Sequence, residues 1–157
     1  MDENLLNPTL KDKQFEEIKS YDIYKLFYIA FFGGLVATII TSAKNAKWLK
    51  VDKKIISISI EVGIVLLLFK VIALSAMLNN VLIEREYLEY LRWGSRIATV
   101  SLYFVNFKLM QKKYRKHIML GGEDEPLLKD AIGYIILGSI IEFVLLFIGK
   151  EAFNNVF

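Results

Sequence analysis

Three ionisable side chains interrupt stretches of sequence that are otherwise almost entirely apolar. Glu61 and Lys70 lie within residues 57–78, and Glu142 lies within residues 131–149. A charge at the centre of a bilayer costs about 2.5–3.5 kcal/mol even on lenient insertion scales, so charged residues there usually pair or line a pathway. These residue types therefore offer ion pairing, proton transfer or the docking of a charged partner.

The spacing of these charges determines which of them can meet. Glu61 and Lys70 are nine positions apart, which in a helix puts them on opposite faces and about 13.5 Å apart along the axis. Lys70 lies about 18 Å along a helix that begins at residue 58, and Glu142 lies about 16 Å along one that begins at residue 131. Because these two helices would run in the same direction, the spacing predicts an intramembrane ion pair between Lys70 and Glu142, within one chain or between copies.

Residues suited to covalent or metal chemistry are scarce. The chain has no cysteine, which excludes disulfides, thiolate metal sites and cysteine nucleophiles, and its one histidine, His117, cannot form a zinc site alone. We expect His117 to be an exposed loop residue. The sequence GGEDEP at 121–126 matches no calcium loop and is expected to form a turn before the last helix, which Asp130 would cap. No catalytic residue, metal or cofactor is predicted, and the protein is not expected to be an enzyme.

The elements that position these charges follow from hydropathy. The chain has 157 residues, of which 55% are hydrophobic, and a mean hydropathy of +0.41. Apolar segments at about 26–40, 58–83, 93–110 and 131–149 alternate with charged stretches, a pattern typical of multipass helical membrane proteins. A soluble bundle would instead place polar residues every three or four positions. We predict an all-α integral membrane helical bundle, with residues 1–20 as a polar cytoplasmic tail and 21–157 as the membrane domain.

The first apolar segment has two interpretations. It has 15 residues, about 22 Å of helix, which is short for a full span. Gly33 and Gly34 at its centre could break the helix into a re-entrant hairpin, leaving three full spans, or could serve close packing in a fourth, tilted span. The hairpin puts fifteen Lys and Arg on one side and four on the other, against eleven and eight for the span. Since cytoplasmic loops carry the excess of positive charge, we favour the hairpin with a cytoplasmic N-terminus.

Several charges are predicted to lie at the membrane surface. Glu61 and Arg96 are expected at the interface. An interfacial helix is predicted around Trp48, with lysines at the headgroups: Lys44, Lys47, Lys50, Lys53 and Lys54. A second basic cluster is expected in a loop, in contact with anionic lipid or with the acidic patch of a partner: Lys108, Lys112, Lys113, Arg115 and Lys116. The net charge of +3 is modest, and nucleic-acid binding is not expected.

Two short motifs, IAFFGG and NAKWLK, lie within residues 29–50. In this stretch the chain resembles small uncharacterised bacterial multipass membrane proteins. The resemblance implies a bacterial cytoplasmic (inner) membrane and no assigned activity.

The intramembrane charges suggest two functions. The first is a non-catalytic accessory or scaffold subunit that docks another membrane protein, or a second copy, through its charged intramembrane face. The alternative is a small transporter or channel component with a polar path through Lys70 and Glu142.

Overall fold

The computed structural model describes residues 18–78 and 85–156. Four helices account for most of them: α1 (Leu26–Trp48), α2 (Lys53–Leu78), α3 (Arg85–Met119) and α4 (Leu127–Val156). The described part of the chain has no strand, and its one isolated β-bridge joins Tyr21 to Glu125. The predicted all-α fold class is confirmed.

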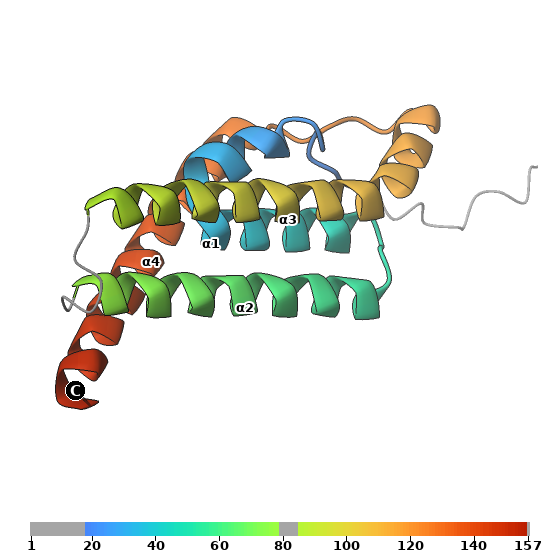
Figure 1. The fold of residues 1–157 in the computed structure, drawn as a ribbon. Coiled ribbons are helices and arrows are strands. Elements are labelled where there is room, and N and C mark those ends of the chain that lie inside the picture. Colours follow the sequence, from blue (N-terminus) through green and yellow to red (C-terminus); the bar gives the residue numbers. More distant parts are fainter. Residues whose placement is uncertain (1–17, 79–84, 157) are drawn as a thin grey trace, which may run out of the picture.

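The first helix is a hairpin rather than a straight rod. Gly34 (φ 75°, ψ −173°) separates two helical arms at 26–33 and 35–48, in a backbone region that is essentially restricted to glycine. The backbone nitrogen of Tyr21 lies 2.7 Å from Asn45 Oδ1, although 24 residues of straight helix would separate these residues by about 36 Å. The chain therefore doubles back at Gly34, and the outer ends of both arms lie together, at the base of the hairpin (Figure 1).

Gly33, next to the break, allows close helix packing, which was the second role predicted for the glycine pair. A Cβ on Gly33 would lie 2.8 Å from Ile135 Cγ1, and one on Gly138 of α4 would lie 3.0 Å from the backbone nitrogen of Ala37. Such approaches require glycine, because side chains would force the helices apart. Gly34 thus makes the turn, and Gly33 lets the hairpin pack closely on α4.

The hairpin lies at the centre of the fold. α1 contacts each of the other three helices, whereas α3 and α4 share no contact among the described residues. Over its most apolar stretch 56% of α1 is buried, against 11% in α2 and in α4. The buried core joins the hairpin base to the second half of α3 through Tyr103, Met110 and Tyr114. The outer faces of α2 and α4 expose large apolar side chains such as Phe69 and Phe143, as expected for helices that face lipid.

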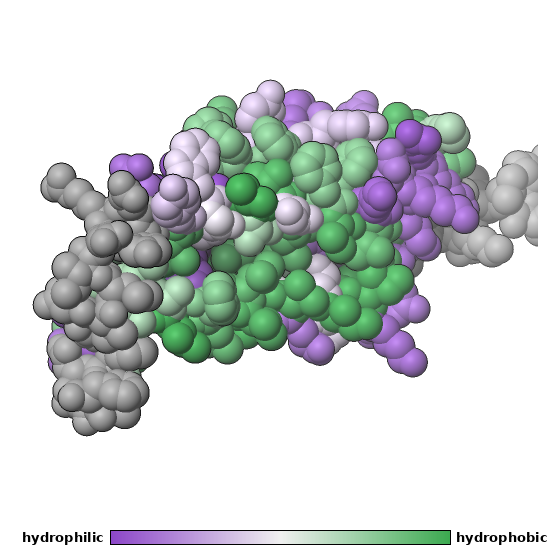
Figure 2. All heavy atoms as spheres, viewed as in Figure 1, coloured by the Kyte–Doolittle hydropathy of each residue, from purple (hydrophilic) through white to green (hydrophobic). Residues whose placement is uncertain are grey.

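Within the described part of the chain, three helices are long and apolar enough to cross a membrane, with candidate spans of 23, 25 and 26 residues in α1, α2 and α4. α1 meets this criterion by length and composition, but its chain returns to the end from which it started. α3 is more polar and lies beside α2 (Figure 1); that it crosses stays a prediction. Figure 2 shows a hydrophobic band over α2 and α3, with hydrophilic side chains gathered at the end where α2 begins. The long apolar helices and their lipid-facing surfaces identify the chain as a membrane protein.

The helices begin and end outside most of the predicted boundaries. The second arm of α1 continues through Lys44 to Trp48, so the predicted separate interfacial helix is wrong. Lys50 (φ 51°) ends this arm, with the Val51 N–H donating to the Ala46 carbonyl at 3.0 Å. Asp52 then caps α2 by accepting a hydrogen bond from the backbone of Lys54 at 2.9 Å.

Other boundaries also differ from the expected ones. The basic cluster at 108–116 lies on the last turns of α3 rather than in a loop, because that helix continues to Met119. α4 begins at Leu127, which places Asp130 in its first turn instead of at its cap. Ser20, expected in the polar tail, is fully buried. Residues 1–17 of the tail and 79–83 of the second predicted segment lie outside the described residues.

The hairpin leads to an expected pattern of thiol labelling. The chain has no native cysteine, so single cysteines can be placed at four exposed positions: Lys19, Lys53, Glu123 and Glu151. With an impermeant maleimide on intact cells, the first three positions should be protected and Glu151→Cys should react. All four should react after permeabilisation. Opposite accessibility of Lys19→Cys and Lys53→Cys would mean that the first segment crosses fully.

Candidate intramembrane charge site

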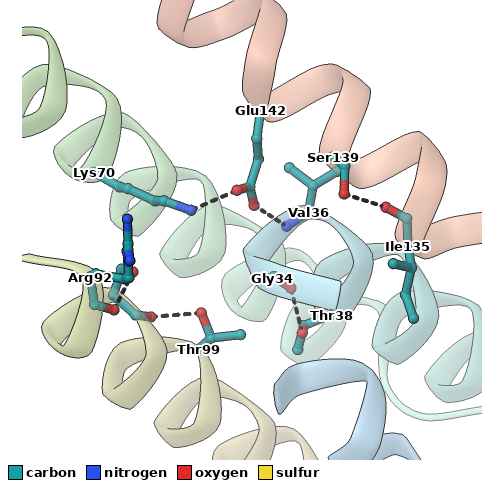
Figure 3. A network of polar contacts seen from close by, with 10 residues as sticks. Gly34, Val36, Thr38, Lys70, Arg92, Thr99, Ile135, Ser139 and Glu142 are labelled. Atoms are coloured by element: carbon teal, nitrogen blue, oxygen red, sulfur yellow. Dashed lines mark hydrogen bonds and ion pairs between the residues drawn. The ribbon is translucent and has the colours of Figure 1, made fainter. Parts of the chain in front are cut away.

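Lys70 of α2 and Glu142 of α4 point toward one another at the tip of the hairpin (Figure 3). Lys70 Nζ lies 2.6 Å from Glu142 Oε2, and the two side chains are 20% and 16% exposed. The other carboxylate oxygen, Oε1, accepts a hydrogen bond from the backbone N–H of Val36 at 3.4 Å. The structure thus brings the two predicted residues together within one chain, and it adds a third contact to the pair.

The Val36 contact arises from the break at Gly34. The first N–H groups of a helix have no partner within the helix and carry a partial positive charge. Because the second arm begins immediately after Gly34, these groups lie at the hairpin tip among apolar helices. Glu142 supplies both an acceptor and a negative charge there. A Cβ on Gly34 would lie 2.9 Å from Glu142 Oε1, so the absence of a side chain leaves room for the carboxylate.

A buried polar stripe runs along the second arm and is not among the residues predicted above. Its members are at most 4% exposed: Thr38, Thr41, Ser42 and Asn45. The hydroxyl groups of Thr38 and Thr41 donate to the carbonyls of Gly34 and Ala37, each at 2.8 Å. The signal is present in the sequence VATIITSAKN, since these positions recur at the spacing of one helix face. The stripe leads from the hairpin tip to its base.

Two buried hydroxyl groups flank the charged pair, one toward each end of the fold. Ser42 Oγ and Ser75 Oγ have no hydrogen-bond partner among the described residues, so each hydroxyl is free to bind a water molecule. Ser42 lines a hollow of about 10 Å³ together with Ser59 and Asn106, which is about the space of one water molecule. Ser75 lies on α2 beyond Lys70, where it packs against Gly149 of α4.

A second charged cluster holds the base of the hairpin to α4. Lys44 Nζ lies 2.7 Å from Asp130 Oδ2 and 3.0 Å from the hydroxyl of Tyr134. The same ammonium lies 4.7 Å from the centre of the Trp48 ring, and the Tyr21 hydroxyl donates to Asp130. Two expectations are therefore wrong: Lys44 faces its own protein rather than headgroups, and the Asp130 carboxylate binds the hairpin instead of capping α4.

This cluster gives stability a dependence on alkaline pH. Burial raises the pKa of Tyr21 from 10.0 to about 12, and its hydrogen bond to Asp130 acts in the same direction. Because the folded state holds this proton more tightly, the contribution is fully present below pH 10 and is lost as the pH rises to about 12. Tyr21→Phe should reduce stability by about 1–2 kcal/mol at neutral pH. Unfolding in detergent should show the gap between wild type and variant closing above pH 10; a constant gap would contradict the assignment.

No family model, curated protein or solved structure matches this chain. The resemblance of residues 29–50 to bacterial multipass proteins stays a prediction, and the function must be argued from the site itself.

The other predicted residues lie apart from the charged pair. Glu61 is exposed and accepts a hydrogen bond from Ser57 Oγ at 3.0 Å. The Arg96 guanidinium lies 5.9 Å from the ring of Phe31 in the first arm. The side chains of the basic cluster on α3 are exposed. The described residues contain no group of three or more acidic, histidine or cysteine side chains able to hold a metal ion.

The prediction for His117 is wrong. Its side chain is 6% exposed, and Nε2 lies 3.2 Å from the carbonyl oxygen of Glu123. Gly121 (φ 80°) ends α3, and the Gly122 N–H donates to the His117 carbonyl at 3.0 Å. This turn folds the following residues back over the histidine, which is therefore part of the helix end.

Proposed function

We propose that this membrane protein transfers protons across the bilayer, as a small transporter or as a component of one, with the Lys70–Glu142 pair as its gate. One observation carries the proposal. A titratable carboxylate among apolar helices is held between an ammonium, at 2.6 Å, and the N–H end of a half-helix, at 3.4 Å. Ionisable groups in transmembrane segments commonly mark proton relays, and broken helices commonly build transporter sites.

The sizes of the polar spaces favour a proton over a hydrated ion. The hollow beside Ser42 has about 10 Å³, enough for about one water molecule. Hydroxyl groups both donate and accept hydrogen bonds, so Thr38, Thr41 and Ser42 can relay a proton with the help of single waters. Ser75 offers a hydroxyl on the other side of the pair. These groups support a narrow relay from the hairpin base past the tip.

In the proposed gate, protons pass through Glu142 and Lys70 in turn. A proton that arrives at Glu142 converts the carboxylate to the acid, which removes the attraction to Lys70 and weakens the hydrogen bond from Val36. Lys70 then lacks its carboxylate partner and releases its own proton on the other side of the pair, toward Ser75. Glu142 then passes its proton to the neutral amine of Lys70, which restores the ion pair and completes the transfer of one proton.

The positive-inside rule supports an orientation for this transfer. The base of the hairpin lies beside the end of α3 and the start of α4, as the hydrogen bond from the Glu125 N–H to the Ser20 carbonyl at 2.7 Å demonstrates. The stretches that meet there hold most of the lysine and arginine residues. We propose that this end faces the cytoplasm of a bacterium, with the hairpin entering the inner membrane from that side.

The accessory-subunit hypothesis has weaker support from the geometry. It needs a charged intramembrane face that is free to bind a partner, whereas Lys70 and Glu142 already bind each other within one chain, although Lys70 also lines a surface hollow between α2 and α3. It stays a prediction, and its test is a stoichiometric membrane partner in mild-detergent pulldowns.

The decisive experiment is proton flux into liposomes that contain only this protein. A potassium diffusion potential supplies the driving force, and a trapped pH dye reports the flux. Wild type should exceed protein-free liposomes. Lys70→Met/Glu142→Gln, which removes both charges without stranding one, should reconstitute normally and return to the protein-free rate.

The matched control is Glu61→Gln, because Glu61 is an exposed carboxylate on the same helix as Lys70 and accepts a hydrogen bond from Ser57 of that helix. This variant should keep the wild-type flux. Wild-type protein without flux, or a charge-free double variant that still conducts, would overturn the proposal. The first result would favour the accessory subunit.

A further inference from the structure

One face of α3 changes from apolar to basic along its length. Residues at spacings of three or four positions share a helix face, and this series continues without a break from small and apolar residues into cations: Gly94, Ala98, Ser101, Val105, Lys108, Lys112 and Arg115. The two halves of the face therefore lie in line, and each borders a hollow in the surface.

The apolar half borders a groove between α2 and α3. Two mainly apolar hollows, of about 500 and 430 Å³, lie along it and share Leu66 and Ala98; the second is also lined by Lys70. On α2 the groove extends from Ile55 to Met77, about 33 Å along the helix axis, close to the roughly 30 Å thickness of a hydrocarbon core. Figure 1 shows α2 and α3 side by side, with the second arm of α1 behind them.

The basic half borders a third hollow, of about 320 Å³, beyond the end of the groove at Ile55 and Leu109. Its lining includes Lys108, Lys112 and Arg115, whose side chains are exposed. Leu109 closes the groove on α3 and is the chain neighbour of Lys108. Lys54, also exposed, precedes the first groove residue of α2. Cations from two helices thus gather where the apolar groove ends, at the hydrophilic end in Figure 2.

We propose that the groove and the basic hollow together bind one anionic phospholipid. One of its two acyl chains lies along Val62, Leu66 and Ala98, in the half of the groove nearer the basic hollow, and its phosphate lies at Lys108 and Lys112. A lipid of this kind matches both halves of the face, since it joins a long apolar chain to a negative headgroup. The transmembrane helix of a partner or of a second copy would fill the groove but would leave the basic hollow without an anion.

The test is native mass spectrometry of the full-length protein. The protein is reconstituted in vesicles of equal parts phosphatidylglycerol and phosphatidylcholine and is then extracted in mild detergent. Wild type should retain one phosphatidylglycerol and no excess phosphatidylcholine. Lys108→Gln/Lys112→Gln removes two surface charges and should lower this retention by roughly thirty-fold. Ala98→Phe, which fills the groove, should also lower it.

Two control variants test whether the loss of lipid is specific to the groove and the basic hollow. Lys47→Gln/Lys129→Gln removes two exposed lysines elsewhere, and Ile136→Phe enlarges an exposed position on α4; both should retain lipid as wild type does. Equal retention of the two lipids by wild type, or unchanged retention in the Lys108/Lys112 variant, would overturn the proposal. So would a wild-type dimer that Ala98→Phe dissociates and that holds no phosphatidylglycerol, because the groove would then be an interface between copies.

Discussion

Lys70→Met and Glu142→Gln should each reduce the free energy of unfolding in detergent by about 3–5 kcal/mol, because each leaves the other charge buried without a partner. The double variant should lose less than either single one. Methionine at position 70 is apolar and close to lysine in length. Glutamine at position 142 still offers an oxygen to the Val36 N–H, which donates to Glu142 at 3.4 Å in the wild type.

The measurement is a double-mutant cycle from reversible unfolding, with Glu61→Gln as the control for loss of one carboxylate. Glu61 is exposed, so this control should change stability by less than about 0.5 kcal/mol. Additive losses in the double variant would show that the Lys70–Glu142 contact contributes no coupling energy. A further variant, Glu142→Leu combined with Lys70→Met, removes the acceptor for Val36 and should be less stable than the first double variant.

Gly34→Ala should be strongly destabilising, for two separate reasons. The backbone of Gly34 (φ 75°, ψ −173°) costs about 1–3 kcal/mol for any residue with a Cβ. The added atom would also lie 2.9 Å from Glu142 Oε1, which displaces the carboxylate from Lys70. We expect a total loss of about 2–4 kcal/mol, read by the same unfolding assay.

The matched control is Gly133→Ala on α4, where a Cβ would meet nothing within 4 Å. Alanine is the better helix former by roughly 0.5–1 kcal/mol, so this variant should be as stable as wild type or slightly more stable. Similar effects of the two substitutions would mean that the turn at Gly34 does not determine the hairpin.

The Lys70–Glu142 pair could be predicted from the sequence because two general rules determine it. The rise of an α-helix is constant, and a charge among apolar residues needs a partner, so Lys70 and Glu142 could be matched by depth alone. The hairpin was a harder case. A glycine pair permits a turn or close packing, and only the distribution of lysine and arginine favoured the turn.

The base of the hairpin could not be predicted in the same way. Lys44 has the spacing of a headgroup lysine, and nothing local indicates that its partner is Asp130, 86 positions away. The second arm continues beyond residue 40 because its polar stripe packs against the rest of the protein. A hydropathy pattern did not predict this, since it ends a membrane segment where polar residues begin. His117 is buried by a turn that follows it in the chain. The Lys44–Asp130 contact joins distant residues and leaves no periodic signal, and the contact that buries His117 depends on the conformation of the turn after it.

The central hairpin has a consequence for the order in which the protein is made. Val36 precedes Glu142 by 106 positions, and ribosomes add about 5–20 residues per second. The hairpin is therefore synthesised roughly 5–20 seconds before the helix that supplies its carboxylates. During that interval its tip and Lys44 lack the acceptors that α4 provides. The hairpin is thus translated well before α4, yet its tip and Lys44 reach their native contacts only once α4 has been made.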